Sequence, residues 1–140
     1  MSFWKRAERT IAQQLRLKGV SCTLIGAQNK PWDILTKSGL HIECKAARLL
    51  RQRRKGHLTR ASFWVVGIAR PHAGKNRLRE AGVNFYVIRL LGDDLRKIYL
   101  VLPAPLRKKQ LQITFRQLLT KYRDNVNAWH LIVDAERRKQ

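Results

Sequence analysis

Residues 31–45 read Pro31-Trp32-Asp33-Ile34-Leu35-Thr36-Lys37-Ser38-Gly39-Leu40-His41-Ile42-Glu43-Cys44-Lys45. Alternating apolar and polar side chains on both sides of Gly39 predict two short strands joined by a turn. A two-residue turn at Ser38-Gly39 would pair Ile34 with Glu43 and put Asp33 on the wrong face. A three-residue turn over 37–39, with Gly39 in the left-handed conformation, instead pairs Asp33 with Glu43.

The three-residue turn is preferred because it separates apolar from polar side chains. It pairs Ile34 with Ile42 and Trp32 with Cys44, so those four side chains form a core face. The opposite face carries Asp33, Leu35, His41, Glu43 and Lys45. Because side chains two residues apart project from the same face of a strand, this register predicts that Asp33, Glu43 and Lys45 converge.

The composition narrows the class of protein. A chain of 140 residues with 44% hydrophobic residues is long enough for one domain with a core. Its net charge of +21 predicts a polyanionic partner, with nucleic acid the first candidate and an anionic membrane surface the second. No apolar run reaches transmembrane length, and residues 1–6 lack a signal-peptide segment. We therefore expect a cytoplasmic protein without a membrane partner.

An amphipathic helix is predicted over 3–18, ending at Gly19. Its inward stripe consists of Trp4, Ala7, Ile11 and Leu15. Glu8 falls on this stripe, where a carboxylate is costly unless something satisfies it. Two interpretations stay open: a salt bridge to a nearby arginine, or an acid that points into a metal site.

The rest of the chain predicts a single α/β domain over 1–140, with a core of about 3–103 and a helix-and-strand extension of about 104–133. Apolar runs predict strands over 20–26, 61–69, 83–91 and 97–103. Thr114 can cap a helix over 115–123 with the stripe Phe115, Leu118, Leu119 and Tyr122. Residues 128–133 are expected to form a last short strand or an apolar anchor, followed by a frayed charged tail. Loops or turns are expected over 27–30, 70–75, 76–82 and 92–94.

A basic tract covers 46–60. Ala46 to Arg51 has the composition of a helix start, which Gly56 would end. The tract is either a solvated face or a phosphate-binding segment, and the second is preferred because it directly follows Glu43 and Lys45. The candidate nucleic-acid contacts are Arg48, Arg51, Arg53, Arg54, Lys55 and Arg60.

Other reactive side chains have simple structural interpretations. Cys22 and Cys44 are expected to be buried free thiols, since no CxxC pair is present. The histidines lack metal-ligand spacing and are expected at the surface or in packing: His41, His57, His72 and His130. The tryptophans are expected in the core rather than as base-stacking platforms: Trp4, Trp32, Trp64 and Trp129.

The converging trio has a chemistry of its own. Two carboxylates, from Asp33 and Glu43, can hold Mg²⁺ together with waters and phosphate oxygens, and the main-chain carbonyl of Cys44 can complete the coordination. Lys45 can steer or deprotonate an attacking water, or neutralise a pentacovalent phosphate. Glu8 can join as a ligand, directly or through water.

This constellation resembles the PD-(D/E)xK nuclease superfamily, which includes type II restriction enzymes and Holliday junction resolvases. The motif here reads Pro31-Trp32-Asp33, then Glu43-Cys44-Lys45, with Glu8 on a preceding helix. The resemblance implies a restriction-endonuclease-like αβββαβ core with a central mixed sheet flanked by helices. It also implies Asp33 and Glu43 as metal ligands, Lys45 as the catalytic lysine and Glu8 as the helix acid.

The expected activity is therefore Mg²⁺-dependent hydrolysis of DNA phosphodiester bonds, with Mn²⁺ as a substitute cation. The alternatives are a non-catalytic basic nucleic-acid-binding protein and an inactive nuclease-like scaffold in a larger assembly. Double-stranded and branched DNA are the expected substrates, and the sequence leaves RNA open. Cutting both strands would favour a homodimer, whose surface we expect in residues 92–140.

Overall fold

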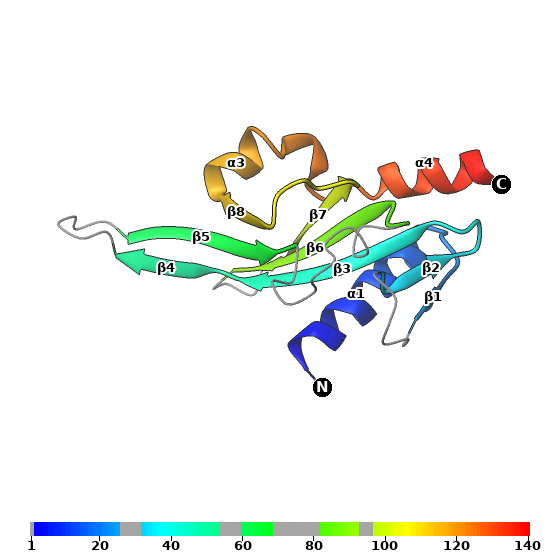
Figure 1. Ribbon diagram of the computed structural model, residues 1–140, viewed down its shortest axis with the longest axis horizontal. Helices are drawn as coiled ribbons and strands as arrows, with labels where there is room; N and C mark the ends of the chain where they lie inside the picture. Colours follow the sequence, from blue (N-terminus) through cyan, green and yellow to red (C-terminus); the bar gives the residue numbers. More distant parts are fainter. Residues whose placement is uncertain (1, 26–31, 54–59, 69–81, 93–96) are drawn as a thin grey trace.

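Strand β3 (His41–Arg48) lies in the middle of a five-stranded sheet in the computed structural model (Figure 1). The structure describes residues 2–25, 32–53, 60–68, 82–92 and 97–140. The sheet order is β1 (Cys22–Leu24), β2 (Ile34–Thr36), β3, β6 (Phe85–Leu91) and β7 (Lys97–Pro103). Because β3 pairs antiparallel with β2 and parallel with β6, the sheet is mixed, which confirms the predicted fold class.

A second sheet has the order β4 (Leu50–Arg53), β5 (Arg60–Gly67) and β8 (Gln110–Thr114). Figure 1 shows β4 and β5 extending together beyond the five-stranded sheet. Apolar side chains of β5 and β8, including Trp64 and Ile113, share one core cluster with Tyr86 and Ile88 of β6. The second sheet therefore covers one face of the first.

The other face of the five-stranded sheet packs against two helices, α1 (Phe3–Leu17) and α4 (His130–Lys139). Ile11 and Leu15 of α1 and Ile132 of α4 join Ile42 and Cys44 of β3 in one cluster. Ser2 caps helix α1 by accepting a hydrogen bond from the Lys5 backbone N–H, and the helix ends before Gly19, whose φ of +87° lies in the left-handed region that favours glycine.

The predicted hairpin register is confirmed within β2 and β3. Ile34 pairs with Ile42, and the Thr36 N–H donates to the Leu40 carbonyl at 3.0 Å, which leaves a three-residue turn. Gly39 has a φ of +99°, the left-handed conformation that this turn requires.

Helix α4 holds this turn in place. The Glu136 carboxylate accepts hydrogen bonds from the Thr36 hydroxyl at 3.0 Å and from the Ser38 N–H at 2.7 Å. The Thr36 hydroxyl in turn accepts from the Leu40 N–H at 2.9 Å. These bonds join residues about a hundred positions apart in the chain, so the C-terminal helix fixes the geometry of the β2–β3 hairpin.

Two local predictions are wrong because tertiary packing overrides local preference. The expected helix from Ala46 is instead the end of β3 followed by β4, since Ala46 and Ala47 pair with Arg89 and Leu90 of β6 and Leu50 pairs with Phe63. The expected strand at 128–133 and the expected frayed tail are instead largely helix α4.

Local sequence features are consistent with helix α4. Ile132 and Glu136 are buried four residues apart, one helical turn, and three basic residues occupy the last turn, where they complement the helix dipole.

Two further predictions need correction. Helix α3 (Phe115–Leu119) is shorter than predicted, although the Thr114 cap is present as a capping box with Gln117. A 3-10 turn, η1 (Arg123–Asn125), follows it. Strand β8 was not predicted, although Gln110–Thr114 alternates polar and apolar side chains. The predictions for 27–31, 54–59, 70–81 and 93–94 fall outside the described residues.

Replacing Glu136 by alanine is expected to lower the free energy of unfolding by about 1–3 kcal/mol, because buried hydrogen-bonding groups of the turn lose their acceptor. Urea denaturation measures the change. The exposed Asp134 on the same helix is the matched control, as Asp134→Ala also removes a carboxylate. Equal effects of the two substitutions would contradict the role of Glu136.

Candidate functional site

The predicted site lies where β3 leaves β2 and passes under α1. On β3, Glu43 and Lys45 form an ion pair with an Oε1–Nζ distance of 3.0 Å, and both side chains are 14% exposed. They stand beside Tyr86 and Ile88 in the parallel register, on the face opposite Ile42 and Cys44. The prediction that Glu43 and Lys45 share a face is therefore confirmed.

Asp33 lies outside the β2–β3 ladder, contrary to the predicted pairing with Glu43. The ladder begins at Ile34, and the Asp33 N–H donates to the Ile42 carbonyl at 2.9 Å. The Asp33 Oδ2 accepts the Cys44 N–H at 2.8 Å. The side chain of Asp33 thus takes over the hydrogen bond that a strand partner would make, and the chain bends at this point.

Trp32 also departs from prediction. It stacks on His41, with ring centroids 4.0 Å apart and planes 4° apart, instead of pairing with Cys44 on the core face. The His41 Nδ1 lies 2.7 Å from the Gly82 carbonyl oxygen. His41 is therefore a packing residue, as expected, and so is Trp32, on the other side of the sheet.

Glu8 on α1 meets Asp33. Burial of its carboxyl, then the charge of Asp33 and a hydrogen bond between the two side chains, raise the pKa of Glu8. The opposing effect of Lys5 is smaller. Two carboxyl groups held side by side share a proton more readily than they ionise together. Glu8 therefore lies next to another carboxyl group, and its role as an acid of a metal site stays a prediction.

Cys44 lies between the Glu8–Asp33 pair and the Glu43–Lys45 ion pair. Burial raises the pKa of its thiol well above the usual range, and the charges of Asp33, Glu8 and Glu43 raise it further. Asp33 also bonds the Cys44 N–H, whereas Glu43 is next to Cys44 along β3 but has its side chain on the opposite face of the strand. Both cysteines are free, as predicted, with Cys44 buried and Cys22 half-buried.

The donors suit a hard cation with a partial protein shell. In the described part of the chain, no three His, Cys, Asp or Glu side chains close into a metal-holding group. Mg²⁺ does not need such a cage, because it keeps several waters and takes one or two carboxylates plus substrate oxygens. The Glu8–Asp33 pair supplies oxygen donors of that kind.

The structure describes the side chains of only some of the basic residues predicted to contact nucleic acid. Arg48 is exposed, and its guanidinium carbon lies 4.5 Å from the centroid of the Phe3 ring. Arg51 is exposed on β4. Arg53 and Arg60 pair in the β4–β5 ladder, and their side chains are not described. Arg54 and Lys55 lie outside the described residues, as do His57 and His72.

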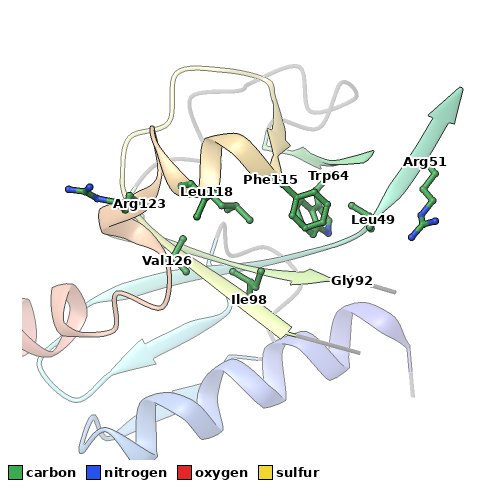
Figure 2. A pocket seen from close by; sticks show the side chains of 10 residues that line it. Leu49, Arg51, Trp64, Gly92, Ile98, Phe115, Leu118, Arg123 and Val126 are labelled. Atoms are coloured by element: carbon green, nitrogen blue, oxygen red, sulfur yellow. The ribbon is translucent and has the colours of Figure 1, made fainter. Parts of the chain in front are cut away.

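An apolar pocket of about 760 Å³ lies apart from these carboxyls, between β7, β5 and α3 (Figure 2). Figure 2 shows Trp64, Phe115, Leu118, Ile98 and Val126 around it, with Arg51 and Arg123 at opposite ends. Phe115 and Leu119 of α3 are exposed, which corrects the predicted stripe. None of the described residues that line the pocket carries a carboxylate or an imidazole.

Trp4 is 58% exposed, so its prediction as a core residue is wrong, whereas Trp64 and Trp129 are buried as predicted. Trp4 packs edge-on against Phe3 at 5.3 Å between ring centroids. The buried stripe of α1 instead runs through Ala7, Ile11, Ala12 and Leu15. None of the described helices is long and apolar enough to cross a membrane.

No protein-family model and no curated protein matches the sequence. Among solved structures, the bacterial homing endonuclease I-Ssp6803I has a similar fold, with a TM-score of 0.67. The similarity covers 96% of this chain and 93% of that chain, at 17% sequence identity. At this identity, the comparison establishes a shared fold.

The raised pKa of Glu8 predicts a pH dependence in the metal-free protein. The folded state keeps the Glu8 proton at pH values where the unfolded chain has lost it, so stability falls as the pH rises from about 4.5, the usual carboxyl value, through the raised pKa. Glu8→Gln has no carboxyl group to ionise at this position. The stability of the variant relative to wild type should therefore rise as the pH increases through this range. Urea denaturation across that range, with a chelator present, tests this; a difference that does not change with pH would contradict it.

Proposed function

We propose that this chain is a metal-dependent endonuclease that hydrolyses DNA phosphodiester bonds. The observation that carries the proposal is the meeting of the Glu8 and Asp33 carboxyl groups beside Cys44, next to the strand that bears the Glu43–Lys45 ion pair. Carboxylates held together repel one another and repel phosphate, so they serve a protein of net charge +21 only when a cation binds among them. A protein that only binds nucleic acid gains nothing from this arrangement.

The roles follow from the positions of the side chains. Asp33 and Glu43 are the proposed cation ligands, and Glu8 and the Cys44 carbonyl are further donors. When bound, Mg²⁺ or Mn²⁺ would neutralise charge developing on phosphorus and lower the pKa of a bound water. Lys45, whose Nζ lies 3.0 Å from the Glu43 Oε1, would orient the attacking water or neutralise the pentacovalent phosphate.

DNA as the substrate is supported by the charge and by the fold shared with a bacterial homing endonuclease. Arg48 and Arg51 follow Lys45 along β3 and β4, so a backbone that passes the site would meet them next. Arg53, Arg54, Lys55 and Arg60 remain candidate contacts by sequence. Cleavage of both strands would require two sites, for which a homodimer is the proposed arrangement.

The first test is cleavage of plasmid, branched and single-stranded DNA with Mg²⁺ or Mn²⁺. Asp33→Asn keeps the acceptor for the Cys44 N–H but removes the charge, and Lys45→Met removes the amine. Each is expected to lower the rate by about 100-fold or more. Asp134→Asn and Lys139→Met, exposed on α4, are the matched controls. No cleavage by wild type on any substrate, or equal cleavage by all variants, would favour the non-catalytic binding protein.

A second test measures the cation without activity. Mg²⁺ or Mn²⁺ should raise the thermal unfolding midpoint of wild type, since binding relieves the repulsion among the carboxylates. The rise should be larger at neutral than at acidic pH, because the cation competes with the Glu8 proton. Asp33→Asn should abolish the effect and Asp134→Asn should keep it; an unchanged effect in both would place the cation elsewhere.

A further inference from the structure

We propose that a cavity at the first turn of α1 is a phosphate-binding site with Arg89 as its central ligand. The cavity has a volume of about 570 Å³ and lies between that turn and the C-terminal ends of β3 and β6. The source of the phosphate, the DNA backbone, rests on the proposed function. The affinity of the cavity for phosphate is independent of that function.

Arg89 is the strongest reason to expect a ligand. It lies on the inner strand β6, between Ala46 of β3 and Tyr99 of β7, and it is 3% exposed. Its Nε and Nη1 atoms are buried without a hydrogen-bond partner. Guanidinium groups do not lose their proton in proteins, so this charge stays inside the fold and needs an anion or several acceptors.

The cavity that Arg89 lines is strongly cationic. Arg6, Arg48 and Lys97 line it with Arg89, and no acidic residue of the described chain does. The packing of Arg48 over the Phe3 ring holds its guanidinium group at the rim. Water entering the cavity would supply hydrogen-bond acceptors for Arg89, but it would leave four positive charges close together. An anion supplies both acceptors and neutralisation.

Phosphate fits this site better than a single carboxylate. The planar fork of an arginine matches two phosphate oxygens at once, and a phosphate has further oxygens for Arg6, Arg48 and Lys97. The volume of the cavity leaves space for more than the phosphate alone. Arg48 lies four residues beyond Cys44, about 13 Å along an extended strand, so one nucleic-acid backbone can reach both the cavity and the carboxyl groups.

The first arm of the test measures unfolding midpoints at increasing inorganic phosphate, with ionic strength held constant by chloride. Wild type should gain roughly 4 °C at ten times the dissociation constant, and the gain should saturate. Arg89→Met should lose the saturable gain. Arg137→Met, which removes an equal charge from the exposed end of α4, should keep it. If Arg89→Met does not fold, Arg48→Gln at the rim serves instead and should weaken the same gain.

The second arm measures binding of a DNA duplex across a salt series, with a chelator and no divalent cation. Arg89→Met should lose a few-fold in affinity and about one unit of the salt slope, and Arg137→Met should lose neither. A phosphate effect without a DNA effect would overturn the backbone as the source and assign the site to a free phosphate. Both arms work without cleavage, so an inactive protein would defeat the proposed function and leave this site standing.

The proposal is overturned if phosphate gives wild type no saturable gain and Arg89→Met binds DNA as wild type does. Asp93 and Asp94 follow Gly92 in sequence and lie outside the described residues. The double variant D93N/D94N tests whether a carboxylate of the chain itself is the counterion. A loss of stability in that variant, together with no phosphate gain in wild type, would decide against an external phosphate.

Discussion

The position of β3 between β2 and β6 is the constraint on which the rest of the structure depends. An inner strand is covered on both faces, so its alternating side chains must enter two different environments. Ile42 and Cys44 fill the core under α1 and α4, while Glu43 and Lys45 stand on the other side as an ion pair. A shift of one residue would bury that pair among aliphatic side chains, which strongly fixes the register.

The candidate site forms where this regular pairing stops. At Asp33 the chain leaves the ladder, and the carboxylate bonds the Cys44 N–H in place of a strand carbonyl. That departure turns Asp33 toward Glu8 on α1, which strict alternation opposite Glu43 would not have done. The bend therefore brings an acid beside a strand end to an acid on a helix. Glu136 supports it from the far end of the chain by holding the adjoining turn.

Electrostatics divides the region around α1 into two parts. Glu8 and Asp33 gather beside the middle of the helix, and Arg6, Arg48, Arg89 and Lys97 surround the cavity at its first turn. Repulsion within each group of like charges destabilises the folded protein when no ligand is bound. A ligand of opposite charge relieves that repulsion. A nucleic-acid backbone with a divalent cation carries both signs. The proposed cation site and the proposed phosphate site would therefore suit one kind of complex, although each can be tested by itself.

The sequence by itself determined the mixed α/β class, the turn at Gly39, the pairing of Ile34 with Ile42 and the shared face of Glu43 and Lys45. All of these follow from side-chain alternation and glycine conformation, which act over a few residues. Strands β4 and β8, helix α4 and the position of Trp32 were not predicted, because pairing and packing with distant segments decided them. Only the tertiary structure revealed the bend at Asp33, the Glu136 hydrogen bonds and the unpaired Arg89. Each depends on groups far apart in the chain, whose proximity no local pattern encodes.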